Sequence, residues 1–343
     1  MKFWTRAVVG AVLGAAAAAP ALAADVSLRF HQFLPPQATI PSKAITPWAA
    51  KVEKDSGGRI KIQRFDAMAL GGRPPELFDQ AKDGVADIVW TVLGYSPGRF
   101  PKTEVFELPF LTTTATASSQ ALMEYVQKNA MDEFADVHLI CVNTHGPGLF
   151  HSRDPITKLE NLKGMKVRGG SRVINIMLDQ LGATPVGMPI TGVGEALSKG
   201  VLDATTIPWE VGPAFKVQQI VHNHTTFSGG KGLYNSTFAM VMNKASYAKL
   251  PPDLKKVIDD NSGQSCSKAF GAAMDAGDVV GKSLAEKAGN KIHVLDTGET
   301  QRWQRVAAGT RAVWYQEVSA KGIDGPKLAQ EAEGLVAKYT RGQ

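Results

Sequence analysis

The chain has 343 residues, of which 44% are hydrophobic and 20% charged, and its formal net charge is +6. This composition is that of an ordinary globular protein and excludes a disordered or low-complexity chain. The positive charge is spread along the chain without a basic cluster between aromatic residues, so we expect no nucleic-acid partner.

The first 23 residues have the pattern of a cleavable signal peptide. Lys2 and Arg6 precede an apolar run that ends near Ala19, and Ala21-Leu22-Ala23 matches the small-x-small pattern of a cleavage site. The apolar run is too short and too rich in alanine to favour a membrane anchor. We therefore predict an exported, periplasmic protein that is soluble after cleavage.

The next segment alternates between strand and helix patterns. Three strands are expected at Val26–Phe30, in "RIKIQRF" and in "ADIVWTV", and two helices lie between them, in "SKAITPWAAKVEKD" and "RPPELFDQAK". Strand and helix in strict alternation predict a parallel sheet with crossover helices.

The alternation restarts near residue 136. Further strands are expected in "DVHLICVNTHG", "GMKVRG", "TPVGMP", "GVLDAT", "TFAMVM" and "NKIHVLD", with helices in "SRVINIMLDQL" and "GVGEALSK". From Pro252 to about Lys287 the pattern is almost wholly helical, and the tail is helical as well. We predict two α/β lobes around a cleft, the first from residues 24–146 and 230–252, the second from 147–229 and 253–343. A single long helix over about 252–287 spans both.

Cysteine and histidine positions do not indicate a metal or a cofactor. Cys141 and Cys266 are interpreted as buried thiols that act as small apolar residues, although their spacing leaves a disulfide open. His222 and His224 could form a metal-binding pair, but a solvated loop is the favoured interpretation, because no cysteine, aspartate or third histidine lies near them. The nucleophile-elbow, zincin, P-loop and dinucleotide motifs are absent from the sequence.

Several residues follow strand ends, where open α/β sheets bind ligands. They are Phe33, the segment Thr91–Tyr95, the segment His145–His151 and Arg168. Arg168 has the clearest chemistry, because a guanidinium presents a planar fork of donors that matches a carboxylate. The two glycines after it would let a ligand come close; the alternative is a surface charge at the end of an edge strand.

The segment "TTIPWEVGPAF" holds an aromatic residue next to a carboxylate in a loop stiffened by prolines. Trp209 and Glu210 could both contact a ligand there. Alternatively, Trp209 packs under the loop and Glu210 is exposed. An exported hydrolase or lyase that uses His145 or His151 with Glu210 is a rival reading of the same residues.

The order and spacing of several blocks resemble the substrate-binding proteins of TRAP (tripartite ATP-independent periplasmic) transporters. The resemblance covers essentially the whole mature chain. It is carried by "SGGRIKIQRF", "ELFDQAKDGVADIV", "FELPFL", "LENLKGMKVR", "LGATPVGMPITGVGEALSKGVLDA" and "LPPDLKKVIDD". It implies a two-lobed α/β fold with a long helix across both lobes, and a carboxylate-binding role for Arg168.

Two departures from the family's sugar-acid branch bear on the ligand. Ile207 stands where that branch has an asparagine, and Gly148 stands where a second arginine can occur. The resemblance therefore implies a less polar site, with one carboxylate on a flat or apolar body. The residues predicted to bind the ligand are Phe33, Thr91, Val92, Tyr95, Phe150, His151, Arg168, Gly170, Met188, Trp209, Glu210 and Tyr234.

These observations predict a monomeric periplasmic binding protein, not an enzyme, that needs no cofactor or metal. It captures an organic monocarboxylate, aromatic or apolar, and delivers it to a TRAP membrane permease after the lobes close by a hinge motion. A short 2-oxo or 2-hydroxy acid, bridged to Glu210 by a cation, is the main rival ligand. A ligand-sensing subunit that passes its closed form to a receptor is a third alternative.

Overall fold

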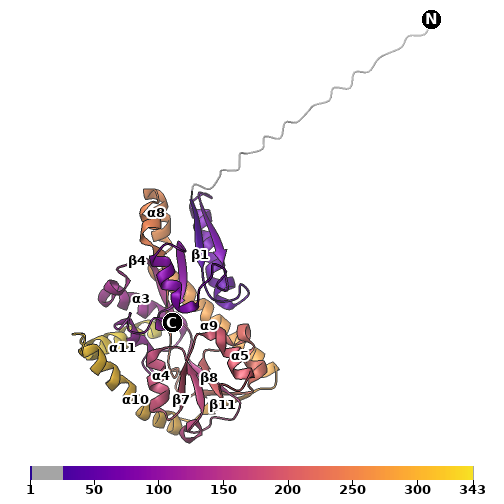
Figure 1. Ribbon diagram of the computed structural model, residues 1–343, viewed down its shortest axis with the longest axis vertical. Coiled ribbons are helices and arrows are strands. Elements are labelled where there is room, and N and C mark those ends of the chain that lie inside the picture. The colour runs from indigo at the N-terminus through magenta and orange to yellow at the C-terminus, as the bar shows by residue number, and fades with distance from the viewer. Residues whose placement is uncertain (2–25, 343) are drawn as a thin grey trace.

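The computed structural model describes Met1 and residues 26–342 (Figure 1). Apart from Met1, the predicted signal peptide lies outside the described residues. Within the described part, no helix combines the length and the apolar character needed to cross a membrane.

The first lobe is built on a mixed five-stranded sheet in the order β2-β1-β3-β10-β4. The three N-terminal strands are parallel, whereas β10 runs antiparallel to both of its neighbours. The strands are β1 (Val26–His31), β2 (Ile60–Phe65), β3 (Ile88–Val92), β4 (Val137–Thr144) and β10 (Thr237–Asn243). β3 and β10 are buried along their whole length, which explains their nearly unbroken apolar sequences.

The second lobe contains a six-stranded sheet in the order β11-β9-β5-β8-β6-β7. Its strands are β5 (Leu149–Ser152), β6 (Lys166–Gly169), β7 (Thr184–Gly187), β8 (Ala204–Ile207), β9 (Asn223–Phe227) and β11 (Lys291–Leu295). The strand patterns identified in the sequence are confirmed, but β5 and β9 were missed. The interpretation of His222 and His224 as a loop is wrong for His224, which is buried within β9.

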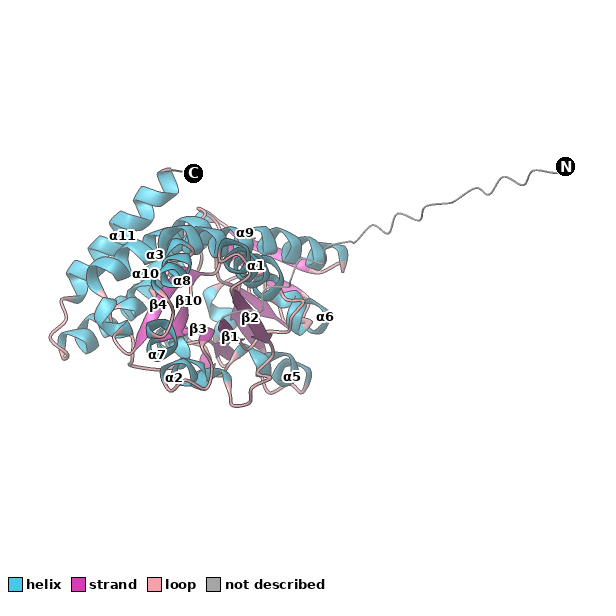
Figure 2. Ribbon diagram, turned by 90° about the horizontal axis from the view of Figure 1, so that it is seen from above, coloured by secondary structure: helices cyan, strands magenta, loops and turns pink. Residues whose placement is uncertain are grey.

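Helices cover both sheets. Figure 2 shows α1, α3 and α8 on one side of the first sheet and α2 and α7 on the other. The helices are α1 (Thr46–Asp55), α2 (Leu77–Lys82), α3 (Ala115–Asn129), α4 (Arg172–Gln180), α5 (Val193–Ser198), α6 (Val217–Ile220), α7 (Lys244–Ala248), α8 (Pro252–Asp260), α9 (Gly263–Lys287), α10 (Thr297–Ser319) and α11 (Gly325–Arg341). Sequence analysis had not identified α3.

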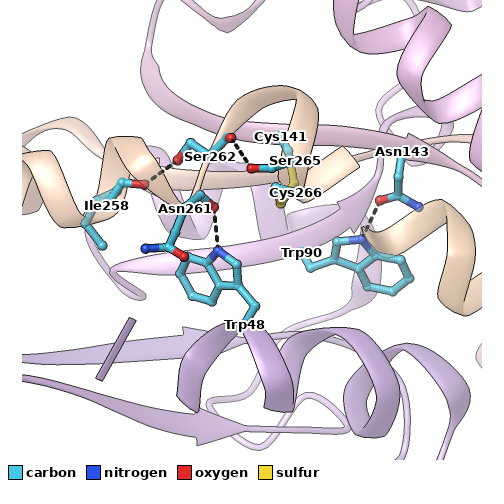
Figure 3. The surroundings of a disulfide bond; sticks show 9 residues. All are labelled: Trp48, Trp90, Cys141, Asn143, Ile258, Asn261, Ser262, Ser265 and Cys266. Carbon is cyan, nitrogen blue, oxygen red and sulfur yellow. Dashed lines mark hydrogen bonds between the residues drawn. A yellow bond between two sulfur atoms is a disulfide. The ribbon is translucent and has the colours of Figure 1, made fainter. Parts of the chain in front are cut away.

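The predicted single helix over about 252–287 is wrong, because the chain breaks it into α8 and α9. Gly263 follows the break with φ of +68°, a conformation that favours glycine. At the junction, the carbonyl of Asn261 accepts a hydrogen bond from the Trp48 indole at 2.8 Å (Figure 3). α8 is thereby fixed to α1 of the first lobe, and α9 continues in a new direction.

A disulfide joins Cys141 of β4 to Cys266 of α9 (Figure 3). The interpretation of the two cysteines as free thiols is therefore wrong. The bond links residues 125 positions apart in the sequence and fixes α9 to β4, an edge strand of the first sheet. It was compatible with export, but the sequence carries no spacing signal that requires it.

The C-terminal helices do not follow the predicted lobe boundary. α11 packs against α3 of the first lobe, and its apolar face joins the larger hydrophobic core of the molecule. α10 packs against α4 of the second lobe. At its end the chain therefore contacts the first lobe again, whereas the prediction assigned residues 253–343 to the second lobe, with the long helix over about 252–287 spanning both.

Two segments cross between the lobes side by side. One leads from β4 to β5 and the other from β9 to β10, and Gly148 exchanges two backbone hydrogen bonds with Leu233 and Tyr234, both at 3.1 Å. A side chain at position 148 would collide with the ring of Tyr234, because a Cβ there would lie 2.3 Å from it. Gly148 therefore makes room for Tyr234.

Candidate functional site

A cavity lies between the lobes, at the carboxyl ends of β1, β3, β6 and β8. This is the place where ligands bind in open α/β sheets. The first lobe contributes Phe33, Leu34, Trp90, Val92, Tyr95, His145, Ser236 and Phe238. The second lobe and the crossing segment contribute Arg168, Gly170, Ile190, Ile207, Pro208, Glu210, Val211 and Tyr234.

Arg168 is the cationic group of the cavity, and it is only 4% exposed. Its Nε donates to the carbonyl of Met188 at 2.9 Å, and Nη1 donates to the carbonyl of Thr206 at 3.3 Å. Nη2 donates to the hydroxyl of Tyr95 at 3.5 Å. A guanidinium carries five N–H donors, so these three contacts leave two N–H groups, one on each terminal nitrogen, for an anion.

No carboxylate of the described residues pairs with Arg168 within 4.0 Å. A buried cation without an anion is costly, so the site favours a ligand that supplies the missing charge. Gly170 explains the close packing beside it, because a Cβ there would lie 3.1 Å from Nη2 of Arg168. The structure thus places Arg168 inside the cleft and excludes the alternative of a surface charge.

Tyr95 brings a second donor to the same end of the cavity. Its hydroxyl oxygen accepts from the backbone N–H of Ile190 at 2.9 Å and from Arg168. With the oxygen accepting twice, its own proton remains available for a ligand carboxylate. Burial raises the pKa of Tyr95, and the neighbouring Arg168 only partly opposes this shift, so the phenol stays protonated at neutral pH.

One wall of the cavity is a stack of aromatic rings from three strand ends. The ring of Phe33 lies parallel to Trp90 with centroids 5.2 Å apart, and Trp90 lies parallel to Phe238 at 4.8 Å. Tyr95 meets Phe33 edge-on at 5.9 Å. The Trp90 indole N–H donates to Asn143 at 3.0 Å, which fixes the ring and satisfies its one polar atom.

His145 is held as a neutral imidazole. Its Nδ1 donates to the carbonyl of Gly146 at 2.6 Å, and its Nε2 accepts from the N–H of Ser236 at 3.0 Å. Burial lowers the pKa of His145 to about 4, and the nearby Arg168 acts in the same direction. Both nitrogens are engaged by the backbone, so His145 is not arranged as the base of a hydrolase.

Six of the predicted binding residues besides Arg168 lie on the cavity wall: Phe33, Val92, Tyr95, Gly170, Glu210 and Tyr234. The structure places the others elsewhere. Phe150 faces away from the cavity and packs edge-on against Trp303 of α10, with centroids 5.6 Å apart. Thr91 lies between Trp90 and Val92 on β3, so its side chain points to the opposite face of the sheet.

Trp209 and His151 form a buried cluster with His224 behind the cavity. The indole ring lies edge-on to His151 at 5.2 Å and to His224 at 4.9 Å, and it is 9% exposed. Gly281 of α9 abuts the carbonyl of Trp209. The expectation that Trp209 stacks on the ligand is therefore not met, whereas the alternative, a tryptophan packed under the loop, describes the structure.

A chain of hydrogen bonds fixes both imidazoles as neutral. Nε2 of His151 donates to the carbonyl of Ile207 at 3.3 Å, and Nδ1 of His151 accepts from Nδ1 of His224 at 2.8 Å. Nε2 of His224 then accepts from the amide of Asn290 at 3.0 Å. Burial lowers the pKa of His151 well below its usual value and that of His224 to about 4. The cluster supports the loop that carries Ile207 and Glu210.

Met188 contributes its backbone rather than its side chain. Its carbonyl holds Nε of Arg168, while its side chain lines a wider groove between the lobes. Sequence analysis also missed Trp90 and Phe238. Strand periodicity could have found both, since Trp90 shares a face of β3 with Val92, and Phe238 pairs with Val92 across the strands.

Polar contacts near the cavity hold the lobes together in this arrangement. Ser171, three residues after Arg168, donates to the carboxyl of Glu107 at 2.5 Å. Arg172 pairs with Glu104 at 2.5 Å. Both acids belong to the first lobe and both partners to the start of α4, so the two contacts join the lobes.

Two α/β lobes that enclose one unpaired cation in an aromatic cavity define a two-lobed ligand-binding protein. Residues 30–317 match the family of bacterial extracellular solute-binding proteins, family 7. The chain belongs to this family, which comprises solute-binding proteins of TRAP transporters, as the sequence blocks had predicted. Family membership makes it a transport binding protein by class.

Several solved structures are similar over nearly the whole chain. A marine metagenome TRAP solute-binding protein, specific for aromatic acids and bound to metahydroxyphenylacetate, is 46% identical, with a TM-score of 0.90 over 92% of this chain and 99% of that one. A protein from Rhodoferax ferrireducens with copurified benzoate is 45% identical, with a TM-score of 0.90 over 92% and 98%. One from Bordetella bronchiseptica with bound mandelate is 28% identical, with a TM-score of 0.84 over 91% and 99%.

Proposed function

We propose that this protein binds an aromatic monocarboxylate in the cavity and delivers it to a membrane permease. The observation that carries the proposal is Arg168: a buried guanidinium with two free N–H groups and no protein anion, at one end of a cavity walled by aromatic rings. One carboxylate would pair with the fork, and the phenol proton of Tyr95 would add a further donor to it.

The apolar lining of the cavity favours a ligand with a flat apolar ring over a sugar acid. A benzene ring that loses about 100 Å² of apolar surface to the cavity gains roughly 2.5 kcal/mol, with about 0.5–1.5 kcal/mol more from aromatic contact. Phe33 and Phe238 offer that surface from the first lobe, and Ile190 and Ile207 from the second. A sugar acid would leave several hydroxyls without partners, each at a cost of about 1–3 kcal/mol.

The similar proteins support this ligand class. Those from the marine metagenome, Rhodoferax ferrireducens and Bordetella bronchiseptica were solved with metahydroxyphenylacetate, benzoate and mandelate, each an aromatic ring with one carboxylate. At 45–46% identity, the first two are close enough for a shared ligand class to be a reasonable expectation. We further propose a monomer, exported to the periplasm, that hands its ligand to TRAP permease subunits and does no chemistry on it; membership of the family supports the transport role.

Binding is proposed to close the lobes by a hinge in the crossing segments and α9. The contacts of Ser171 with Glu107 and of Arg172 with Glu104 would then form on closure. Small-angle scattering with and without benzoate tests this step, and the radius of gyration should fall on saturation. An unchanged radius would argue for a cleft that does not close.

A thermal-shift panel of organic acids tests the ligand class. The panel contains benzoate, 3-hydroxybenzoate, 3-hydroxyphenylacetate and mandelate, with pyruvate, lactate, succinate and gluconate as competing classes. A ligand present at 100 times its dissociation constant adds about 2.7 kcal/mol of stability. We expect the aromatic acids to give the largest shifts; larger shifts with pyruvate, lactate or gluconate would overturn the proposal.

A further inference from the structure

Glu210 is the one carboxyl side chain among the described residues that line the cavity. It is only 6% exposed, and none of the described lysines, arginines or histidines forms an ion pair with it. The hydroxyl of Thr39 lies beside it and donates to the backbone carbonyl of Glu210 at 3.4 Å. A buried carboxylate without a partner is costly, and it would repel an anionic ligand in the same cavity.

The backbone and α9 hold Glu210 in place. Its N–H donates to Oδ1 of Asp278 at 2.8 Å, and Gly277 lies so close that a Cβ there would be 2.8 Å from Cβ of Glu210. The side chain cannot withdraw toward α9, which leaves the cavity and the outer groove beside Thr39 as the spaces that it faces.

The charges around Glu210 favour its neutral form. Asp278 is the nearest charged group, while Asp275 is already bound to the N–H groups of Ala115 and Thr116 at 2.7 and 2.9 Å. Burial, and then Asp278, raise the pKa of Glu210 to about 8.

Other titratable groups do not offset this effect. Lys43 and Lys216 line the outer groove without pairing with Glu210, and His145 is neutral. The positive charge of Arg168 lowers the pKa values of Tyr95 and Tyr234, so it lies near these two tyrosines. It does not contribute to the pKa shift of Glu210. At neutral pH the cavity therefore holds one cation and one uncharged carboxylic acid.

We propose that Glu210 acts as a neutral hydrogen-bond donor that recognises an uncharged oxygen on the ligand's ring and excludes a second carboxylate. This inference rests on the proposed function. Arg168 takes the one carboxylate, and the O–H of Glu210 reaches an acceptor such as a ring hydroxyl. A dicarboxylate would bring a second negative charge to a group that offers no positive partner.

The arrangement links anion binding to a proton. An ionised Glu210 would share a water-poor cavity with the ligand's carboxylate, so binding selects the protonated form. In the protein without ligand, burial and Asp278 raise the pKa of Glu210 to about 8, so benzoate affinity should be constant below about pH 8. Above that, affinity should fall by up to about tenfold per pH unit.

Calorimetric titrations of the whole mature protein separate these effects. The probes are benzoate from pH 6 to 9.5, and 3-hydroxybenzoate, 3-methylbenzoate and isophthalate at pH 7. The variants are Glu210→Gln, which keeps a donor but cannot ionise, and Glu210→Leu, which has no donor. Asp278→Asn is the matched control, because Asp278 is also buried with its pKa raised to about 7 but does not line the cavity.

Wild type should bind 3-hydroxybenzoate about tenfold more tightly than 3-methylbenzoate, as one hydrogen bond would give, and isophthalate at least about 100-fold more weakly than benzoate. Glu210→Leu should abolish the hydroxyl preference. Glu210→Gln should keep it and lose the pH dependence. Asp278→Asn should retain the fall in affinity but at a lower pH, because it removes a charge that raises the pKa of Glu210.

An unchanged hydroxyl preference in Glu210→Leu, or an unchanged pH dependence in Glu210→Gln, would overturn the inference. If the alkaline fall in benzoate affinity disappears in Asp278→Asn but not in Glu210→Gln, the titrating group is Asp278, and the inference about Glu210 is overturned as well. Failure of wild type to bind any of the aromatic acids would instead overturn the proposed function. Urea midpoints for each variant show whether a loss reflects unfolding, and Glu210→Gln, being isosteric, keeps the test decisive.

Discussion

Replacement of Arg168 by alanine removes the charge and both N–H groups that the protein leaves free for a ligand. Truncation of one partner in a buried, hydrogen-bonded charge pair costs about 2–5 kcal/mol, so benzoate affinity should fall by about 30-fold to several thousandfold. Arg168→Lys should also bind at least about tenfold more weakly, since an ammonium cannot hold the carbonyls of Met188 and Thr206 and a carboxylate at once.

Stability should change less than affinity in these variants. Alanine leaves those two carbonyls without their donor, at a cost of about 1–3 kcal/mol each, but it also removes a buried cation that lacks an anion. The assay is calorimetric titration with benzoate, with urea unfolding as a check on folding. Arg302→Ala is the control, because it removes an exposed arginine of the same lobe. Benzoate affinity within about threefold of wild type in Arg168→Ala would refute the reasoning.

Three further changes test the surroundings of the site. Gly170→Ala should weaken benzoate binding several-fold in calorimetry, because the new Cβ would press on the guanidinium from 3.1 Å; unchanged affinity would mean that the arginine has room to shift. Arg172→Ala, which removes the contact with Glu104 between the lobes, should raise the dissociation constant by about three- to thirtyfold without touching the cavity wall, and stopped-flow release should show a faster off-rate. Double replacement of Cys141 and Cys266 by alanine should lower the free energy of unfolding in urea by about 2–5 kcal/mol, as expected for a long loop; an unchanged midpoint would contradict the stabilising role of the disulfide.

Elements with strong hydrophobic periodicity were predictable from the sequence, and so was the position of Arg168. β3 and β10 are apolar on both faces, and Arg168 stands at the end of β6 before two glycines. The strands that were missed, β5 and β9, bury histidine and threonine, whose polar atoms are satisfied by partners distant in sequence. β9 has few apolar residues, and β5, with Leu149 and Phe150, is only four residues long, so neither shows a clear strand period.

The site was predictable where strand geometry decides it and not where packing does. Alternate residues of a strand share one face, so a strand with Val92 on the cavity wall must also place Trp90 there and point Thr91 to the other face. The orientation of Trp209 was not predictable in this way, because the sequence of the loop is compatible with a ring in the cavity or a ring packed under the loop. Close contact with Gly281 of α9 and with the histidines behind the loop determines the second orientation. The helix break was within reach, since "DDNSGQS" between α8 and α9 is rich in turn-forming residues.

The most direct test of the account compares benzoate with benzamide, a neutral molecule of the same shape, in calorimetric titrations of wild type. The two rings have the same contacts with the aromatic wall. The two free N–H groups of Arg168 and the phenol of Tyr95 favour a carboxylate, whose negative charge and second acceptor oxygen benzamide lacks. We predict one benzoate bound per chain and at least about 100-fold weaker binding of benzamide, equivalent to about 2.7 kcal/mol. Benzamide binding as tight as benzoate would contradict the claim that the buried guanidinium selects the ligand.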